Sequence, residues 1–393
     1  MKVLILSRLY PNDVEPTMQI PIEEQAKFFS KKCEIKVISP KSYFPPIKCF
    51  KSWYKKRLVP KFQVRNGIEV YYPRYFWLPY RRFPLGGIFY FLGSIFTVLK
   101  IKKAGFDFDI IHTYFSYPDG FAAVLIGKWL KKPVVIIEGM SYFTSMMESP
   151  FCRPQILYAI ANSKKVICET NAQRKKICAG GVKDEKTVVL QKGVDLSKFK
   201  LNIRPIEQFP KKLLFVGLLI PRKGIVPLIN VVKRLTEAGY NIILDVIGDG
   251  ELREDVKEQV RELRLEKYVN FLGARPNEEV AEYMQDCDLF VLPSFAESFG
   301  VVVIEALACG KPVVSTYCGG PEDILTKDTG ILIQPGDENA LFEAIKYILD
   351  NPQKYDSQRI RKYAECKYDL DIVTSKMVEL YQQILNEEKT SCK

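Results

Sequence analysis

Short apolar runs alternate with longer segments of helical periodicity along most of the chain. Runs of about four to eight apolar residues are typical of parallel strands buried on both faces, and apolar residues every three or four positions predict amphipathic helices. Before residue 200 such runs are interleaved with helical stretches at 22–30 and 121–130. This alternation predicts a parallel, doubly wound sheet. The strands expected here are residues 2–7, 33–39, 68–73, 109–115, 133–139, 164–170 and 186–193.

The pattern is interrupted once and then starts again. Residues 200–211 are polar, contain two prolines and follow neither period, so we expect them to join two domains, 1–203 and 204–370. The alternation after residue 212 predicts a second doubly wound domain. Its expected strands are 212–219, 241–250, 268–273, 288–294, 312–316 and 330–335, and its first helices are 224–238 and 251–263.

The last segment, 371–393, is expected to be a separate helix. Between residues 371 and 385 the apolar positions are 373, 377, 380, 381 and 384, which form a stripe on one helical face. From its position after the second domain, we expect this stripe to pack back on the first domain.

Composition places the chain among globular proteins, and its charge is unevenly distributed. Residues 1–200 carry 34 Lys and Arg against 15 Asp and Glu, a net charge of +19, whereas residues 201–393 carry 24 against 31, a net charge of −7. The basic half indicates an anionic partner, and charge alone does not distinguish nucleic acid from an acidic membrane surface. The basic residues follow no known nucleic-acid motif, so we expect no nucleic-acid partner.

Cysteine and histidine usage argues against a zinc cluster. The ten cysteines include no C-x-x-C pair, and His112 is the single histidine. The apolar run after Lys2 is only four residues long, which does not resemble a secretion signal. We therefore expect a cytoplasmic protein with reduced thiols.

A basic aromatic segment at 43–104 leaves three interpretations open. Between Arg82 and Lys100 lie 17 uncharged, mostly apolar residues. They are compatible with a buried helix beside solvated lysines, or with a surface that places aromatic rings and lysines at an anionic membrane. A transmembrane helix is the least favoured, because it needs about 20 apolar residues.

Three strand-to-helix loops of the second domain carry candidate chemistry. In open α/β sheets ligands bind beyond the carboxyl ends of the strands. One loop brings Lys223 to the start of a helix, a second contains Gly248, and a third contains Glu297 followed eight positions later by Glu305. The start of a helix attracts anions, so two carboxylates flanking one are unusual.

A nucleotide sugar would explain this arrangement. Its diphosphate suits the helix start, and its ribose and sugar hydroxyls extend in opposite directions, where carboxylates accept hydrogen bonds. Eight residues span about 12 Å if they are helical throughout.

The same segments resemble glycosyltransferase family 4, retaining enzymes of the GT-B fold. The resemblance is carried by ESFGVVVIEALACGKPVVSTYCGGPEDI and GILIQPGD, with FVGLL, RKG, VIGDGEL, FLGARPNEEV and LQKGVDLSKF in the expected order. The start, SRLYPNDVEP and EEQAKFFSK, is similar to members that build bacterial cell-surface polysaccharides. The resemblance implies two Rossmann-like domains facing each other across a cleft.

The resemblance also implies roles for individual residues. Glu305 would bind the ribose hydroxyls, Glu297 a hydroxyl of the donor sugar, and Lys223 the diphosphate. Catalytic candidates are Glu297, Lys223 and His112, the last because the family often has histidine there. Candidates for donor binding are Gly217, Arg222, Lys223, Gly248, Phe271, Arg275, Glu297, Ser298, Phe299, Gly300, Val301 and Glu305.

Three departures from the family pattern are visible. Leu218 stands where the family commonly has arginine, and Glu138 and Gly139 stand where it usually has a histidine. The usual NGVD has become KGVD at 192–195. A lone histidine near a strand end is more often structural than functional, so His112 has two interpretations.

Taken together, the expected activity is retaining transfer of a hexose from a UDP- or GDP-sugar to a saccharide or polyprenyl-linked acceptor. Asp107 and Asp109 form a D-x-D pair, a pattern that can hold a metal ion, but they precede a strand instead of following one. We therefore expect no metal, and we expect no cofactor. The enzyme would be peripheral on the inner face of the plasma membrane, with an anionic membrane surface as a partner. The alternative is a catalytically degenerate GT-B protein that binds nucleotide or saccharide as a scaffold.

Overall fold

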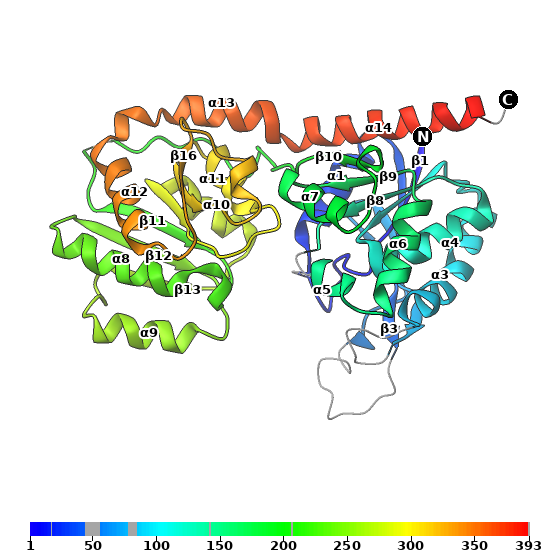
Figure 1. Ribbon diagram of the computed structural model, residues 1–393, viewed down its shortest axis with the longest axis horizontal. Helices are drawn as coiled ribbons and strands as arrows, with labels where there is room; N and C mark the ends of the chain where they lie inside the picture. Colours follow the sequence, from blue (N-terminus) through cyan, green and yellow to red (C-terminus); the bar gives the residue numbers. More distant parts are fainter. Residues whose placement is uncertain (17, 44–55, 78–84, 141–142, 206, 392–393) are drawn as a thin grey trace. The chain divides into compact units, whose positions relative to one another are not determined.

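The computed structural model describes residues 1–16, 18–43, 56–77, 85–140, 143–205 and 207–391, in two compact units (Figure 1). Unit 1 comprises Met1–Gln191 and Val373–Lys393, and unit 2 comprises Lys192–Ile372. The division falls before the expected boundary at residue 203. The N–H of Val194 donates to the carbonyl of Tyr368 at 2.7 Å, and Val194 and Phe199 are both part of the core of unit 2.

Unit 1 is built on an eight-stranded sheet with a short two-stranded sheet beside it. The strands are β1 (Lys2–Leu6), β2 (Glu34–Ile38), β3 (Lys41–Tyr43), β4 (Phe62–Arg65), β5 (Ile68–Tyr71), β6 (Arg74–Phe76), β7 (Ile110–Tyr114), β8 (Val134–Glu138), β9 (Lys165–Cys168) and β10 (Thr187–Val189). The order in the large sheet is β10-β9-β8-β7-β1-β2-β5-β4, and β3 pairs with β6. Neighbours are parallel except β4, which runs antiparallel to β5.

Both faces of the large sheet are covered, which explains why its central strands are apolar throughout. Successive side chains of a strand point to opposite faces. Leu4 and Leu6 of β1 therefore belong to one core cluster, and Val3 and Ile5 belong to another. The helical segments of this unit are α1 (Ile20–Ser30), α3 (Gly86–Lys103), η1 (Ser116–Gly120), α4 (Phe121–Leu130), α5 (Phe143–Met147), α6 (Cys152–Asn162), α7 (Asn171–Ala179), η2 (Asp184–Lys186) and most of α14 (Leu370–Ser391).

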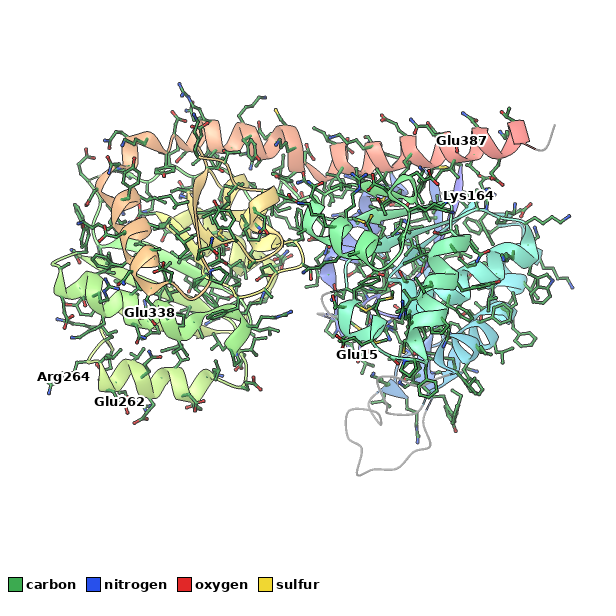
Figure 2. The ribbon with its side chains drawn as sticks, in the orientation of Figure 1. Glu15, Lys164, Glu262, Arg264, Glu338 and Glu387 are labelled. Carbon is green, nitrogen blue, oxygen red and sulfur yellow. The ribbon has the colours of Figure 1, made fainter. Side chains whose placement is uncertain are left out.

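The apolar stripe of α14 packs on unit 1. Met377, Tyr381 and Ile384 are buried in the same cluster as Ile5 and Phe29. Near the end of the helix, Lys164 forms an ion pair with Glu388, next to the Glu387 that Figure 2 labels.

Helix α3 contains most of the uncharged run of the basic aromatic segment, and one side of it is buried. Tyr90 and Val98 lie in the core, while Leu92 and Phe96 are exposed. Among the helices that the structure describes, none combines the length and the apolar character needed to cross a membrane. Residues 44–55 and 78–84 of this segment lie outside the described part of the chain.

Unit 2 has a six-stranded, fully parallel sheet, as the second run of alternating elements predicts. Its strands are β11 (Lys211–Val216), β12 (Ile242–Ile247), β13 (Val269–Gly273), β14 (Leu289–Leu292), β15 (Val313–Thr316) and β16 (Gly330–Ile333), in the order β13-β12-β11-β14-β15-β16. Its helical segments are η3 (Pro221–Lys223), α8 (Ile225–Glu237), α9 (Arg253–Glu262), α10 (Asn277–Asp286), α11 (Val301–Ala308), η4 (Pro321–Asp323), α12 (Glu338–Asp350), η5 (Pro352–Lys354) and α13 (Ser357–Tyr368).

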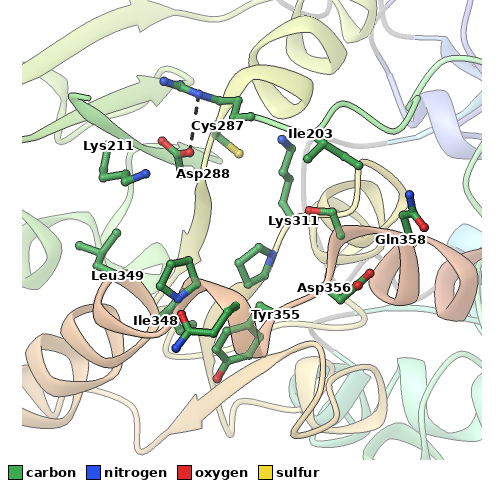
Figure 3. A pocket seen from close by; sticks show the side chains of 15 residues that line it. Ile203, Lys211, Cys287, Asp288, Lys311, Ile348, Leu349, Tyr355, Asp356 and Gln358 are labelled. Carbon is green, nitrogen blue, oxygen red and sulfur yellow. Dashed lines mark ion pairs between the residues drawn. The ribbon is translucent and has the colours of Figure 1, made fainter. Parts of the chain in front are cut away.

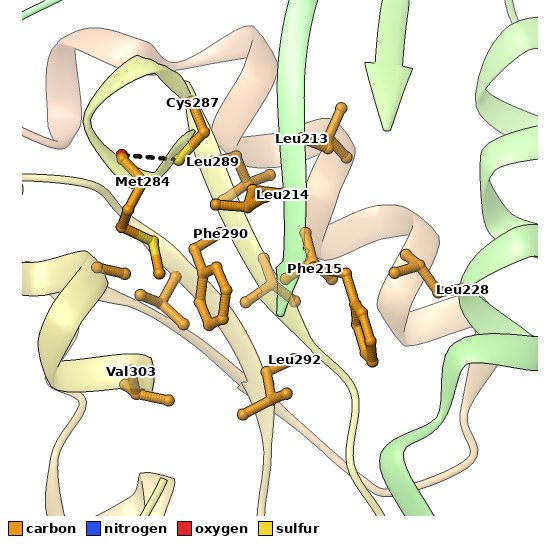
Figure 4. Close-up of a cluster of buried hydrophobic side chains, with 14 of the residues drawn as sticks. Leu213, Leu214, Phe215, Leu228, Met284, Cys287, Leu289, Phe290, Leu292 and Val303 are labelled. Carbon is orange, nitrogen blue, oxygen red and sulfur yellow. Dashed lines mark hydrogen bonds between the residues drawn. The ribbon is translucent and has the colours of Figure 1, made fainter. Parts of the chain in front are cut away.

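One apolar cluster forms the core of unit 2. Phe215 of β11 and Phe290 of β14 lie within it, together with Leu228 of α8 and Val303 of α11 (Figure 4). Polar side chains such as Glu262, at the end of α9, point outward (Figure 2). The two parallel α/β sheets expected from the sequence are therefore confirmed.

Candidate active site

The sheet of unit 2 has a topological switch point between β11 and β14. These strands are neighbours, yet the chain leaves β11 toward β12 and leaves β14 toward β15, on the opposite side. Ligands of open parallel sheets bind beyond the carboxyl ends of the strands where this reversal occurs. Lys223 follows β11 and Glu297 follows β14, so both predicted residues lie at this point of the fold.

Lys223 and Glu297 form a direct ion pair. Nζ of Lys223 lies 2.5 Å from Oε1 of Glu297, and the Oγ of Ser294 donates to the same oxygen at 2.8 Å. The two charged side chains are only 15% and 9% exposed, which strengthens their attraction relative to a pair in open water. A cation and a carboxylate are thus held together at the edge where the family resemblance expects diphosphate and sugar.

The loops at this edge are hydrogen-bonded to one another. The N–H of Phe295 donates to the carbonyl of Arg222 at 2.8 Å, and the N–H of Glu297 donates to the carbonyl of Cys318 at 3.0 Å. The N–H of Leu219 bonds in the same way to the loop after β12. These cross-links hold the site residues in place although they come from separate strands.

Two glycines are required for these loops to approach each other. Gly224 has φ of +71°, and a Cβ there would lie 2.0 Å from the carbonyl oxygen of Pro293. Gly248 has φ of +142°, and a Cβ there would lie 1.8 Å from the carbonyl oxygen of Gly217. Left-handed backbone and such contacts exclude any other residue.

The N–H groups of Gly217 and Gly248, two of the candidates for donor binding, are not available to a ligand. The N–H of Gly217 donates to the carbonyl of Ile247 at 3.0 Å, and that of Gly248 donates to the carbonyl of Gly273 at 2.9 Å. Their contribution is therefore the close packing of the loops.

The predicted anion-binding segment lies at the beginning of α11. Gly300, in a left-handed conformation with φ of 90°, precedes Val301, the first helical residue. In an α-helix the first N–H groups have no acceptor within the helix, so this start can receive an anion. Ser298 is half-buried just before it. Because the helix begins only at Val301, the span of 12 Å, which assumed a helix from residue 297, does not apply.

Phe299 and Glu305 are more buried than a ligand-facing role suggests. The side chain of Phe299 lies in the core, edge-on to the ring of Tyr368 with centroids 6.5 Å apart, so only its backbone is available to a ligand. Glu305 is one helical turn beyond Val301, on the same face of α11, and is 7% exposed.

Arg222, Phe271 and Arg275 lie at the same edge of the sheet. Arg222 is exposed. Phe271 is half-buried in the middle of the edge strand β13. Arg275 follows that strand and is exposed, with its guanidinium 3.0 Å from Glu279 and donating to the carbonyl of Leu272.

His112 is a buried structural residue of unit 1. It lies within β7 with no exposed surface, and burial lowers the pKa of its imidazole to about 3. Its Nδ1 is 2.8 Å from the hydroxyl of Tyr381, and the edge of its ring meets Phe29. A group without exposed surface does not contact a substrate, so we remove His112 from the catalytic candidates.

A polar cluster at the carboxyl edge of the sheet of unit 1 was not identified from the sequence. Glu138, at the end of β8, is fully buried and accepts hydrogen bonds from the N–H of Ser116 at 2.8 Å and of Met140 at 3.0 Å. Burial raises the pKa of this carboxyl group, and the hydrogen bonds oppose that shift.

Asp119 and Lys41 belong to the same edge. Asp119 is also fully buried, accepts from the N–H of Arg8 at 2.6 Å and from the hydroxyl of Tyr90 at 2.8 Å, and burial raises its pKa. Burial lowers the pKa of Lys41 to about 8, and its amino group donates to the carbonyls of Arg8 and Tyr10. The rule that ligands bind at carboxyl edges could have selected these residues, since Arg8 and Lys41 follow β1 and β2.

The two acids considered for metal binding are engaged elsewhere. Asp107 lies 2.6 Å from Nζ of Lys102 and 3.1 Å from Nζ of Lys132, and Asp109 accepts from the N–H of Lys2 at 2.7 Å. Within the described ranges no group of three or more His, Cys, Asp or Glu side chains has the arrangement of a metal site.

Two family descriptions match adjoining parts of this chain. The model described as Glycosyltransferase Family 4 matches residues 24–198, and the model described as Glycosyl transferases group 1 matches residues 198–366. The chain belongs to glycosyltransferase family 4. The resemblance drawn from the E-x7-E region is thereby confirmed at the level of the family.

Several relatives of this family-4 glycosyltransferase carry names from bacterial polysaccharide synthesis. TuaC of Bacillus subtilis, a glycosyltransferase assigned to teichuronic acid biosynthesis, is 29% identical over 367 residues, which cover 88% of each chain. The amylovoran biosynthesis glycosyltransferase AmsK of Erwinia amylovora is 34% identical over 258 residues, which cover 62% of each chain.

Solved structures show that this family-4 chain has the GT-B fold. Sucrose-phosphate synthase from Thermosynechococcus elongatus has a TM-score of 0.76 at 18% identity, covering 98% of this chain and all of that one. Anabaena Alr3699/HepE, in complex with UDP-glucose, has a TM-score of 0.71 at 20% identity with the same coverage.

Two departures from the family-4 pattern can now be placed in the fold. Leu218, where the family commonly has arginine, is 57% exposed directly after β11. Glu138, at the strand end where the family usually has histidine, is enclosed by donors from Ser116 and Met140. Arg222 follows Leu218 four residues later in the same loop.

Proposed function

We propose that this protein is a retaining hexosyltransferase. It would transfer the sugar of a UDP- or GDP-hexose to a hydroxyl of a saccharide or lipid-linked saccharide during cell-surface polysaccharide synthesis. The names of TuaC and AmsK support a role in polysaccharide synthesis, and the UDP-glucose in the Anabaena structure supports a nucleotide sugar as the donor. The main support is the ion pair between Lys223 and Glu297 at the switch point.

In this proposal the two sides of the ion pair exchange partners when the donor binds. Lys223 turns from Glu297 to the diphosphate, together with the N–H groups at the start of α11, from Ser298 to Val301. Glu297, freed from its ion pair, accepts a hydrogen bond from a hydroxyl of the sugar. Glu305 binds the ribose, and the segment from Phe271 to Arg275 lines the base pocket.

The proposed transfer needs no metal ion and no cofactor. The leaving diphosphate gains negative charge as the glycosidic bond breaks, and a fixed cation and a helix start both stabilise that charge. Lys223 and the first turn of α11 would supply these two elements.

In this proposal the acceptor binds unit 1, beside an anionic membrane surface. On α3, Ile88, Leu92 and Phe96 are exposed at helical spacing, and Phe96 is 73% exposed. Apolar side chains beside lysines suit the interface of a membrane rich in anionic lipid. A lipid-linked acceptor would be held there, which agrees with a cytoplasmic enzyme that is peripheral on the inner face of the plasma membrane.

Two measurements test this proposal. Incubation with UDP- and GDP-hexoses should raise the melting temperature and release nucleotide when a saccharide acceptor is present. Flotation with vesicles containing anionic lipid should recover the protein, and replacement of Phe96 and Leu92 by serine should reduce that recovery. If no donor stabilises the protein or is consumed, the enzymatic proposal is refuted.

A second candidate function is a degenerate GT-B protein that binds nucleotide or saccharide as a scaffold. The exposed Leu218 favours it, because it replaces a cation of the family pattern. This candidate predicts nucleotide binding without turnover that is unchanged by Glu297→Ala. The enzyme predicts turnover that Glu297→Ala abolishes and that Leu218→Arg retains or increases.

A further inference from the structure

A separate cavity lies at the opposite edge of the sheet of unit 2, where its strands begin (Figure 3). Its volume is about 370 Å³, at the lower end of the range for small-ligand sites. Lys211 opens β11, Asp288 precedes β14 and Lys311 precedes β15, so three neighbouring strand starts form its polar wall. Residues 203–204 and parts of 348–358 form the remaining walls.

Three cationic side chains line this cavity, and all three are largely removed from water. Lys211 is 9% and Lys311 is 3% exposed, and the side chain of Arg204 is 5% exposed. Burying a charge is costly unless an opposite charge faces it. Burial accordingly lowers the pKa of Lys311.

The two carboxylates of the cavity wall are already bound to backbone groups. Oδ2 of Asp288 accepts from the N–H of Lys212 at 2.7 Å. Oδ1 of Asp356 accepts from the N–H of Arg359 at 2.8 Å, as the cap of α13. A third acid, Asp286, pairs with Arg204 and with Lys212. Three acids thus face the four cations Arg204, Lys211, Lys212 and Lys311, and two of these acids also accept hydrogen bonds from the backbone.

Lys311 and Arg204 have donor capacity that the carboxylates do not use. Nζ of Lys311 donates to the carbonyl of Asn202 at 2.6 Å, a neutral acceptor. Nη1 of Arg204 donates to the carbonyl of Asp286 at 2.7 Å, whereas its Nε is buried, makes no hydrogen bond and lies 3.6 Å from Oδ1 of Asp288. An anion within the cavity would supply the missing acceptors.

We propose that this cavity binds a small organic phosphate. The charged group would lie between Lys211 and Lys311, which line the cavity from the starts of β11 and β15, on either side of β14 (Figure 3). The carbon skeleton would contact the apolar part of the wall, formed by Ile348, Leu349 and Tyr355. Lysine ammonium groups suit phosphate because they act as point charges that tolerate several approach directions.

This site is distinct from the proposed donor site. The two lie at opposite ends of β11, β14 and β15, and β11 alone is six residues long, from Lys211 to Val216. At about 3.3 Å per residue the strand separates them by roughly 17–20 Å. A phosphate held by Lys211 and Lys311 therefore does not reach Lys223, and the inference does not depend on the proposed function.

Calorimetric titration of the full chain with glycerol 3-phosphate and with inorganic phosphate, at constant ionic strength, tests the proposal. We expect saturable binding at one site per chain. Lys211→Gln and Lys311→Met should each raise Kd by about tenfold or more, because each removes a charged hydrogen-bond donor. Lys233→Gln is the matched control, since Lys233 lies on α8 and pairs with Glu237 at 3.1 Å, away from the cavity.

Wild-type protein provides a second measurement in case the buried-lysine variants fold poorly. Glycerol 3-phosphate should slow amide exchange in peptides covering 202–204 and 353–359, and leave 217–224 unchanged. The proposal is overturned if neither phosphate binds saturably, or if Lys233→Gln weakens binding as much as the cavity variants. It is also overturned if Lys223→Met abolishes the binding, because the phosphate would then occupy the opposite edge.

Discussion

The substitution Glu297→Gln should separate two effects of one carboxylate on the proposed donor. In the structure, Oε1 of Glu297 lies 2.5 Å from Nζ of Lys223 and 2.8 Å from Oγ of Ser294. A diphosphate that approaches Lys223 must replace this ion pair and also meets the negative charge of Glu297. Glutamine keeps an acceptor oxygen for Ser294 and removes the charge. We therefore expect free UDP or GDP to bind more tightly to the variant.

The expected magnitude follows from the charges. Two like unit charges about 7 Å apart repel by roughly 2 kcal/mol at an effective dielectric constant near 20. Solvent at the edge of the site reduces this to about 1 kcal/mol, which corresponds to roughly fivefold in Kd. The substitution should also weaken the contact with the donor sugar, because loss of a charged acceptor for the sugar hydroxyl costs about 1.5–3 kcal/mol. The nucleotide sugar should thus lose its advantage over the free nucleotide, and turnover should fall roughly ten- to a hundredfold.

Titration calorimetry with UDP, GDP and their hexose conjugates measures these effects, and release of nucleotide reports turnover. Lys223→Met is the matched variant on the other side of the ion pair. It should raise the Kd of the free nucleotide by about tenfold or more, since it removes a charged hydrogen-bond donor. If Glu297→Gln raises the Kd of the free nucleotide as Lys223→Met does, Glu297 does not bind the sugar and the proposed exchange of partners is incorrect.

Three further outcomes are expected. Turnover should persist in EDTA, and its loss with recovery on adding a divalent cation would contradict metal-independent transfer. Gly224→Ala should abolish nucleotide binding, because its Cβ would lie 2.0 Å from a carbonyl oxygen. Gly239→Ala, a glycine of similar φ with open space around it, should cost only about 1–2 kcal/mol of stability in urea unfolding. Burial lowers the pKa of His112 from 6.5 to about 3. Between these values only the unfolded chain binds a proton at His112. The contribution of this residue to the free energy of unfolding is therefore complete above pH 6.5 and is lost as the pH falls toward 3. His112→Gln should reduce the dependence of unfolding free energy on pH in this window by up to about 1.4 kcal/mol per pH unit, and an unchanged slope would contradict the burial.

The local hydrophobic pattern was sufficient to predict most of the strands, but it missed a few. The central strands are apolar because both of their faces are covered, as Leu4 and Ile5 show by joining different clusters. β4 was missed because its sequence, FQVR, is half polar, and it becomes a strand by pairing antiparallel with β5 at the sheet edge. The start of unit 2 was placed too late because Val194 pairs with residues near 369, which the local sequence does not reveal.

For the candidate site, the sequence identified the loops better than the contacts within them. Lys223 and Glu297 could be selected because each follows a buried strand of a parallel sheet. That they form an ion pair depends on the order of β11 and β14 in the sheet. Gly248 was selected for donor binding, but its N–H donates to the carbonyl of Gly273, and a Cβ there would meet the carbonyl oxygen of Gly217.

The sequence alone determined two parallel α/β units and the loops where polar residues leave buried strands, because burial on two faces requires apolar runs of strand length. Only the tertiary structure decided which polar groups meet. Lys223 and Glu297 are 74 positions apart, and His112 and Tyr381 are 269 apart. The cavity lined by Lys211 and Lys311 likewise arises from strand order. Contacts at such separations depend on how the sheet is assembled, which the periodicity of single segments does not contain.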